Sequence, residues 1–361
     1  MDAEREFQPE PPPLDDGSAA ASVDTALSAM GQIGDERLRQ LAWQLLDVLA
    51  LLKPAGVRRV WLNALDSKDQ VEKALALLEK SSLATVSESR MSVAMPRPVA
   101  QAVQAGHADQ GRLEKAVAAT ATVLESAAQA LKPSGPTGPA LATLTQGEAT
   151  DLAAHVRWLL AQGGPAAQNW SVIKAGNLCG VALNQVDSPR DAIAIFKTMV
   201  SAAKGLGGQA HPETLTLRHN MAMSFHLIGR SNKAIRLFKA VVAMRTRVLG
   251  PDHPDTLAAK NNLAYVYGAS GRVAKAIRLH EAALADTARV LGPDHPDTLR
   301  AQHNLSGAYY SAGRVDEAAD LLQAVLAGRE RALGRDHPET RRARNNLSML
   351  SGTWQGDVWS D

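Results

Sequence analysis

The sequence predicts a mainly α-helical protein whose C-terminal half is an α-solenoid of stacked hairpins, preceded by a small winged-helix-like domain. The first observation behind this is a motif that recurs at a constant step of 42 residues, which is typical of solenoids. The second is composition. Aromatic residues make up 4% of the 361 residues, and segments rich in Ala and Leu favour close-packed helices over sheets.

Charge and cysteine usage narrow the functional classes. A net charge of +2 is too small to indicate nucleic-acid or membrane binding by itself. The single cysteine, Cys179, permits no intrachain disulfide and favours a reducing compartment. The acidic N-terminus lacks the features of an export signal, and the longest apolar segment, 45–52, is too short to cross a bilayer. We therefore expect a cytoplasmic protein with no membrane partner.

The N-terminal third reads as a tail followed by a small domain. Residues 1–22 are rich in Pro, Asp, Glu, Ser and Ala, which predicts disorder. Residues 23–106 contain a leucine-striped helix, a second helix over 71–83, and a hairpin from Ala84 to Ala94. Helices followed by a hairpin are typical of a winged helix. Residues 107–171 form a predicted helical bridge with a Pro- and Gly-rich connector at 132–147.

The C-terminal repeats share a set of positions that recur every 42 residues, most clearly an Asn, a Gly-Arg pair and a His-Pro-Asp/Glu-Thr motif. We divide the array at 172–350 into a divergent repeat 172–214, repeats 215–256, 257–298 and 299–340, and a half repeat 341–350, followed by a tail at 351–361.

The residues of each repeat predict a helical hairpin. Pro254 suits the first helical position, where its missing N–H costs nothing, and Asp255 favours the positive end of the helix. Gly271 ends the first helix, and small residues such as Ala276 let neighbouring backbones approach. The four motif histidines cannot share a metal. Packed helices lie about 8–10 Å apart, whereas a zinc ligand lies about 2.1 Å from its ion. We expect them to cap helices, and we expect no cofactor and no catalytic residue.

These residues resemble the tetratricopeptide repeat family, in the longer form found in kinesin light chains. The resemblance rests on Asn-Leu-Ala-x-x-Tyr, Gly-Arg, the second-helix alanine and the Leu-Gly-x-x-His-Pro-Asp/Glu-Thr junction, and it covers residues 172–350. It implies that the first helices line a concave groove in which an asparagine holds the backbone of an extended peptide.

The resemblance predicts a set of peptide-binding residues that share one face of the first helices. They are Asn177, Asn220, Asn262, Asn304, Asn346, His219, Asn261, His303, Asn345, Tyr265, Arg300 and Arg342. A carboxamide suits this role because it donates and accepts hydrogen bonds simultaneously. The alternative is that the asparagines bond between repeats and order the stack. Arg300 and Arg342 would suit a ligand with acidic groups, unless they are simply solvated.

A second resemblance covers about residues 23–110. Leu78-Glu-Lys-Ser-Ser-Leu83, the hairpin and Met95-Pro-Arg-Pro-Val99 are similar to the winged-helix segment of STAND NTPases of the NB-ARC kind, in which a tetratricopeptide array often follows. Pro96 stands where that family has a phosphate-contacting histidine, and no Gly-x-x-x-x-Gly-Lys-Ser/Thr motif occurs. We therefore expect no nucleotide binding and no recognisable nucleotide-binding domain.

Three functional hypotheses follow. The first is a non-enzymatic scaffold that binds an extended segment of a protein partner. The second is the sensor remnant of a STAND switch that acts with a separate NTPase chain. The third is a transcriptional regulator with a DNA-binding winged helix. Nucleic acid is the less favoured partner, because acidic residues balance the lysines of the helix that would enter the groove, over 66–82.

Overall fold

The computed structural model describes residues 16–108, 110–130 and 146–350. The chain divides into two compact units. Of the described residues, unit 1 contains 16–108, 110–130, 146–191 and 201–206, and unit 2 contains 192–200 and 207–350. Helix α9 (Pro189–Gly207) is divided between them.

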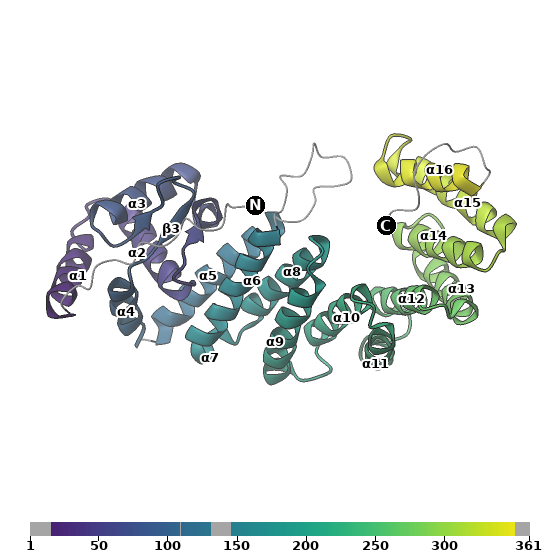
Figure 1. Ribbon diagram of the computed structural model, residues 1–361, viewed down its shortest axis with the longest axis horizontal. Helices are drawn as coiled ribbons and strands as arrows, with labels where there is room; N and C mark the ends of the chain where they lie inside the picture. Colours follow the sequence, from purple (N-terminus) through teal and green to yellow (C-terminus); the bar gives the residue numbers. More distant parts are fainter. Residues whose placement is uncertain (1–15, 109, 131–145, 351–361) are drawn as a thin grey trace. The chain divides into compact units, whose positions relative to one another are not determined.

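Unit 1 begins with helices that surround a small sheet (Figure 1). The elements are α1 (Asp16–Met30), α2 (Glu36–Leu51), β1 (Val57–Arg58), the 3-10 helix η1 (Arg59–Ala64), α3 (Lys68–Lys80), β2 (Thr85–Val86), β3 (Ser92–Ala94), α4 (Arg97–Ala105) and the 3-10 helix η2 (Gly106–Ala108). The strand order is β1-β3-β2, with both pairs antiparallel. Val93 of β3 pairs with Val57 and Val86, and the leucine stripe of α2 is buried against α3 and α4.

The predicted hairpin is present as β2 and β3, and the two predicted helices are α2 and α3. The assignment of this region as a winged helix stays a prediction. The predicted disorder of residues 1–22 is wrong for 16–22, which begin α1. The run Ala19–Ala21 has high helix propensity, and α1 packs against α4 and α2. Residues 1–15 lie outside the described residues.

Four further helices belong to the bridge and the start of the repeats. They are α5 (Gln110–Ala130), α6 (Gln146–Gln162), α7 (Gly164–Ala167) and α8 (Trp170–Gln185). Helix α8, which the sequence assigns to the divergent repeat, packs against α5 and α6. His155 of α6 accepts a hydrogen bond of 3.0 Å from the backbone N–H of Lys53, and burial lowers the pKa of His155 to about 4. Of the predicted connector at 132–147, residues 132–145 lie outside the described residues.

Unit 2 is a series of helical hairpins followed by a single helix (Figure 1). The first helices are α10 (Pro212–Leu227), α12 (Pro254–Ala269), α14 (Pro296–Ser311) and α16 (Pro338–Leu350), and the second helices are α11 (Ser231–Leu249), α13 (Val273–Leu291) and α15 (Val315–Leu333). Each first helix begins 42 residues after the one before it, so the sequence period is the structural period. The tail at 351–361 lies outside the described residues.

The His-Pro-Asp/Glu-Thr motif forms the junction between hairpins. The His253 side chain caps α12, where its Nδ1 accepts a hydrogen bond of 3.1 Å from the N–H of Asp255, and Pro254 occupies the first turn. The Thr256 hydroxyl donates to the carbonyl of Gly250 at 2.9 Å. Gly250 has φ of 96°, a conformation that favours glycine. The predicted capping role of the motif histidines is therefore confirmed.

The cores of the hairpins contain small side chains where helices meet. The alanine that recurs in each second helix, at Ala234, Ala276 and Ala318, is fully buried. A larger side chain at these positions would hold neighbouring helices apart. Among the first helices, α12 packs against its successor α14. The constant step places the predicted binding positions at equivalent places in successive repeats.

Candidate functional site

The predicted binding positions of unit 2 lie on one side of the first helices. We call this set the column face. It comprises the residues four before, one before, at, and three after each repeat asparagine on α10, α12, α14 and α16, apart from the buried Asn261 and Asn346. On α10 these are Thr216, His219, Asn220 and Met223, all half-buried. Half-burial at offsets of three and four indicates a helix face that is partly open to solvent.

Two pairs of side chains join α10 to α12, one of them on this face. The Asn262 carboxamide donates from its Nδ2 to Nε2 of His219 at 2.8 Å. Burial, together with the positive charges of Arg245 and Arg300, lowers the pKa of His219 to about 3, so the imidazole is neutral and can accept. His226 meets the ring of Tyr265 edge-on, with centroids 5.4 Å apart. The inter-repeat hydrogen bond, which is the alternative role of the asparagines, is thus present for Asn262, whose carbonyl oxygen can still accept from a ligand.

Asn261, one residue earlier, is turned into the hairpin. It is 4% exposed, and its carbonyl oxygen accepts a hydrogen bond of 2.9 Å from Nδ1 of His280 on α13. Burial lowers the pKa of His280 to about 4, which keeps this ring neutral as well. The Asn261 carbonyl oxygen is thus bonded and its side chain is covered inside the repeat, so its contact with a ligand stays a prediction. The helical step of 100° separates its side chain from that of Asn262.

The remaining predicted residues differ in their exposure to solvent and in the unit to which they belong. Asn220, Asn304, His303 and Tyr265 are half-buried on the column face. Asn346 is 8% exposed, which removes most of its side chain from solvent, whereas Asn345 is exposed. Asn177 lies on α8 in unit 1, apart from the unit that holds the other four asparagines. The candidate site is therefore confined to unit 2.

The two predicted basic residues carry acidic partners on their own helices. Arg300 contacts Asp297 at 2.6 Å, and Arg342 contacts Glu339 at 3.3 Å. Both pairs are largely exposed, so each contributes little to stability. They nevertheless neutralise much of the positive charge on which the expectation of an acidic ligand rested.

Two buried arginines on second helices were not predicted from the sequence. Arg245 of α11 is 4% exposed and reaches between α10 and α12. Its Nη1 donates to the Asp255 carbonyl at 2.8 Å, and its Nη2 donates to Thr216 Oγ1 at 3.1 Å. Arg329 of α15 is 6% exposed and donates to the Glu339 carbonyl at 2.9 Å. The sequence does contain a signal for a shared structural role, because the two arginines occupy the same repeat position.

A shallow hollow lies between α12, α13 and α14. Its volume is about 250 Å³, open solvent included, and its lining includes Ala258, Thr287, Asp297 and Arg300. Ala258 and Arg300 belong to the column face. The hollow is shallow and lies beside the row of half-buried polar groups.

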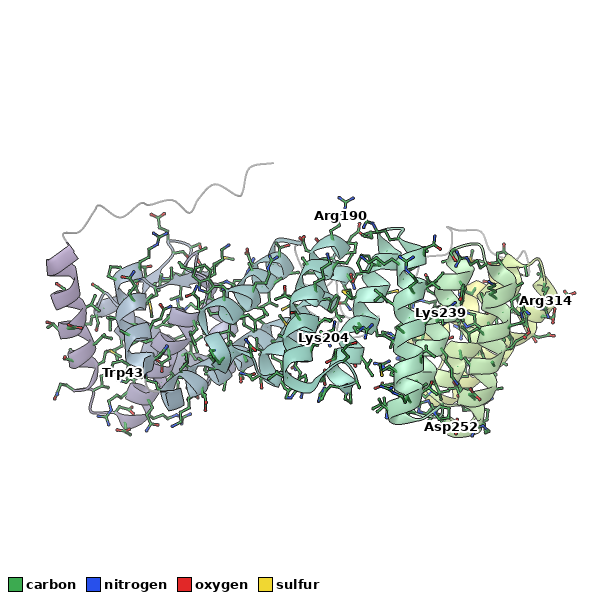
Figure 2. All side chains as sticks on the ribbon, turned by 90° about the horizontal axis from the view of Figure 1, so that it is seen from below. Trp43, Arg190, Lys204, Lys239, Asp252 and Arg314 are labelled. Carbon is green, nitrogen blue, oxygen red and sulfur yellow. The ribbon has the colours of Figure 1, made fainter. Side chains whose placement is uncertain are left out.

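The junctions provide no metal site. Within the ranges that the structure describes, no three His, Cys, Asp or Glu side chains come together in a way that could hold an ion. One junction aspartate, Asp252 (labelled in Figure 2), contacts Arg289 of α13. This pair recurs one repeat later as Asp294 and Arg331, at 2.5 Å.

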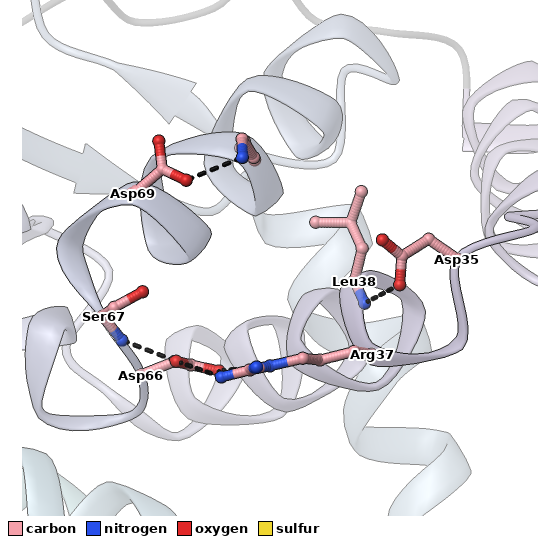
Figure 3. A network of polar contacts seen from close by, with 7 residues as sticks. Asp35, Arg37, Leu38, Asp66, Ser67 and Asp69 are labelled. Atoms are coloured by element: carbon pink, nitrogen blue, oxygen red, sulfur yellow. Dashed lines mark hydrogen bonds and ion pairs between the residues drawn. The ribbon is translucent and has the colours of Figure 1, made fainter.

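The surface around α3 in unit 1 is balanced in charge. Figure 3 shows Arg37 of α2 extended towards Asp66, with Nη2 2.8 Å from Oδ1. The Ser67 backbone N–H and the Arg37 guanidinium lower the pKa of Asp66. Lys73 contacts Asp69 at 2.6 Å. Such pairs reduce the basic charge that a phosphate backbone would need. Of the helices described, none is both long and apolar enough to cross a bilayer.

Comparisons with known proteins identify the repeats. The sequence matches the Tetratricopeptide repeat family over residues 213–285 and 255–330. A search of curated proteins found no match. Tetratricopeptide repeats generally mediate protein–protein interactions and are typically non-catalytic.

Several solved structures are similar to the chain. One contains the nearly identical TPR-like repeats of a Podosopora anserina protein described as a kinesin light chain, with 28% identity, 50% of this chain and 85% of that chain covered, and a TM-score of 0.44. Another is a STAND protein of Pyrococcus horikoshii with a tetratricopeptide repeat sensor, with 10% identity, coverages of 86% and 53%, and a TM-score of 0.41. A third is a Rap protein complexed with competence and sporulation factor, with 11% identity, coverages of 94% and 98%, and a TM-score of 0.35.

These TM-scores lie below 0.5, so the assignment rests on the sequence match and on the helical hairpins that repeat at the matched positions. Residues 213–330 are a tetratricopeptide-repeat array.

Proposed function

We propose that the protein is a non-catalytic scaffold whose column face binds an extended segment of another polypeptide. The observation that carries this proposal is the row of half-buried polar side chains on successive first helices, from His219 and Asn220 through Asn262 to Asn304. An extended chain carries an N–H and a C=O at each residue, and these groups need partners when they are covered. Carboxamides spaced by a constant structural repeat supply both donors and acceptors.

The inter-repeat contact of Asn262 leaves one of its polar atoms for a ligand. Asn262 uses its amide nitrogen for His219, which fixes the orientation of the carboxamide and leaves its oxygen to accept. A side chain that is already oriented loses little rotamer freedom on binding. The neutral state of His219, caused by burial, likewise favours an uncharged backbone ligand over a phosphate.

The acidic character expected of the partner has less support. Arg300 and Arg342 each hold a carboxylate of their own helix, so an acidic ligand would have to compete with Asp297 and Glu339. We therefore propose a polypeptide ligand that is held mainly through its backbone, without requiring acidic side chains.

The proposal is tested with random linear peptides displayed on phage and selected on the full chain. The selected peptides are synthesised, and their affinity is measured by fluorescence anisotropy. Asn304→Ala should weaken binding by roughly 1 kcal/mol, or about fivefold, because one oriented hydrogen bond is lost. Gln323→Ala, which removes an exposed amide from the second helix α15, serves as the matched control. Failure to enrich any peptide, or equal affinity for both variants, would contradict the proposal.

The sensor-remnant hypothesis remains a second proposal that rests on the motifs at 78–83 and 95–99. It predicts that the chain forms a complex with a separate ATP-binding protein. Size-exclusion chromatography of a co-expressed genomic neighbour that carries a phosphate loop checks this, and elution as two separate species would count against it.

A further inference from the structure

One position of the second helices holds a large side chain in two repeats and a small one in the repeat between them. It is Arg245 in α11, Thr287 in α13 and Arg329 in α15, at the constant step of the array. Both arginines are buried and donate to the carbonyl of the residue that follows the next junction proline, Asp255 for Arg245 and Glu339 for Arg329, at 2.8 and 2.9 Å. In both of these repeats a buried guanidinium thus donates to the first turn of the following first helix.

The middle repeat lacks that filling. Thr287 is buried, and its hydroxyl donates to the Ala283 carbonyl of its own helix at 2.6 Å, so it does not reach α14. The shallow hollow between α12, α13 and α14 lies at this place. Its lining residues Ala258, Thr287 and Asp297 are the repeat equivalents of Thr216, Arg245 and Asp255, the residues that form the guanidinium site around α11.

The chemistry of the hollow matches the missing group. A carbonyl oxygen has two lone pairs, so the Asp297 carbonyl can accept a side-chain donor in addition to its helical bond. The third repeat shows that the neighbouring carboxylate can serve two arginines. Glu339 holds Arg329 at 3.0 Å and Arg342 at 3.3 Å, whereas Asp297 holds Arg300. Leu257 and Leu291 also line the hollow and can cover an aliphatic stem.

We propose that the hollow binds the guanidinium side chain of an arginine from a bound polypeptide, in the place that the chain's own arginines fill in the repeats on either side. The proposal deepens the proposed function and rests on it, because Ala258 and Arg300 belong both to the hollow and to the column face. The arginine would donate to the Asp297 carbonyl and carboxylate. Its planar fork suits these two acceptors better than an ammonium does.

A small-molecule experiment tests the hollow without any peptide. The full chain is titrated with N-acetyl-arginine amide while the backbone amide resonances are followed by NMR. We expect saturable shifts at Asp297 and Thr287 in the millimolar range, where single side chains typically bind. N-acetyl-citrulline amide, which has the same shape without the charge, should cause none. Equal shifts with citrulline, or no saturable shift, would overturn the proposal.

Thr287→Arg supplies the group from within the chain, with Thr287→Met as the control of similar stem and no guanidinium. We expect a higher Tm for the arginine variant than for the methionine variant, and loss of N-acetyl-arginine amide binding in the arginine variant alone. A lower Tm for the arginine variant, or retained binding of the probe, would place the guanidinium elsewhere and refute the assignment.

A peptide arm separates this proposal from the proposed function. A selected peptide that contains arginine is compared with its citrulline analogue on the wild type and on Thr287→Arg. We expect about a tenfold preference for arginine that disappears in the variant, while the affinity for the citrulline analogue stays the same. Binding of both peptides without preference would refute the guanidinium site and retain the column face. Absence of peptide binding together with saturable N-acetyl-arginine amide binding would refute the column face and retain the guanidinium site.

Discussion

Replacement of Asn261 tests the distinction between structural and binding asparagines. Asn261 and His280 are 4% and 2% exposed, and they are joined by a hydrogen bond of 2.9 Å. Asn261→Ala removes the acceptor and leaves the Nδ1–H of His280 without a partner in a place that bulk water does not reach. The perturbation is therefore the loss of one buried hydrogen bond together with the desolvation of the group left behind.

The magnitude follows from that geometry. A buried donor left unsatisfied costs about 1–3 kcal/mol, and burial already keeps the pKa of His280 near 4, so the ring cannot recover the loss by becoming charged near neutral pH. Asn345 occupies the same repeat position two repeats later but is exposed. Asn345→Ala should change the free energy of unfolding by about 0.5 kcal/mol or less.

Urea denaturation followed by circular dichroism measures both variants. The midpoint for Asn261→Ala should fall clearly below that for Asn345→Ala, with an unchanged dependence on urea. The double variant Asn261→Leu/His280→Leu should recover most of the loss, since replacing both partners by apolar groups can be nearly neutral. Equal midpoints for the two single variants would refute the assignment of Asn261 to the core of its repeat.

Three other predictions concern stability. Burial lowers the pKa of His155 and of His280 from 6.5 to about 4, so their neutral forms stabilise the fold fully above about pH 6.5. Acidification from about pH 7.5 to about pH 5 should therefore lower the free energy of unfolding by roughly 2 kcal/mol for each histidine. A urea midpoint that does not change over this pH range would contradict this prediction. His253→Ala removes the cap of α12 and should cost about 0.5–2 kcal/mol, seen as a lower Tm. Gly163→Ala places a methyl group 2.9 Å from the Leu159 carbonyl oxygen and should destabilise the fold by about 1–3 kcal/mol. The added methyl of Gly307→Ala meets nothing within 4 Å, so this variant should stabilise its helix by about 0.5–1 kcal/mol. A Tm for Gly163→Ala at or above that of Gly307→Ala would contradict this prediction.

The period and the junctions of the array could be predicted from the sequence because they depend on local chemistry. A histidine before a proline caps a helix wherever the chain makes that turn, and His253 does so as expected. The constant step likewise determined where each hairpin begins, since every repeat must present the same face to the next.

The orientation of individual side chains could not be predicted in the same way. Asn261 and Asn262 are adjacent and chemically identical, yet one bonds inside its hairpin and the other bonds across to the preceding repeat. Their difference depends on His280 and His219, which are distant in sequence and whose positions only packing determines. The buried arginines were missed for a related reason, because an arginine near a helix end reads as a solvated residue until the helices around it are placed.

The helix at 16–30 shows the limit of composition as a guide. Acidic and proline residues near the N-terminus suggested disorder over 1–22, but the alanine-rich end of this stretch continues into a helix that packs on α4. Composition averages over a window, whereas a helix begins wherever local propensity and a packing surface coincide.

Photo-crosslinking measures most directly whether a polypeptide lies on the column face. Benzoylphenylalanine is placed at Met223, half-buried on α10, and in a separate variant at Val248, exposed on the second helix α11. Each variant is irradiated with a phage-selected peptide. We expect a covalent adduct at position 223 and none at 248. An adduct at 248 alone, or equal adducts at both positions, would contradict it.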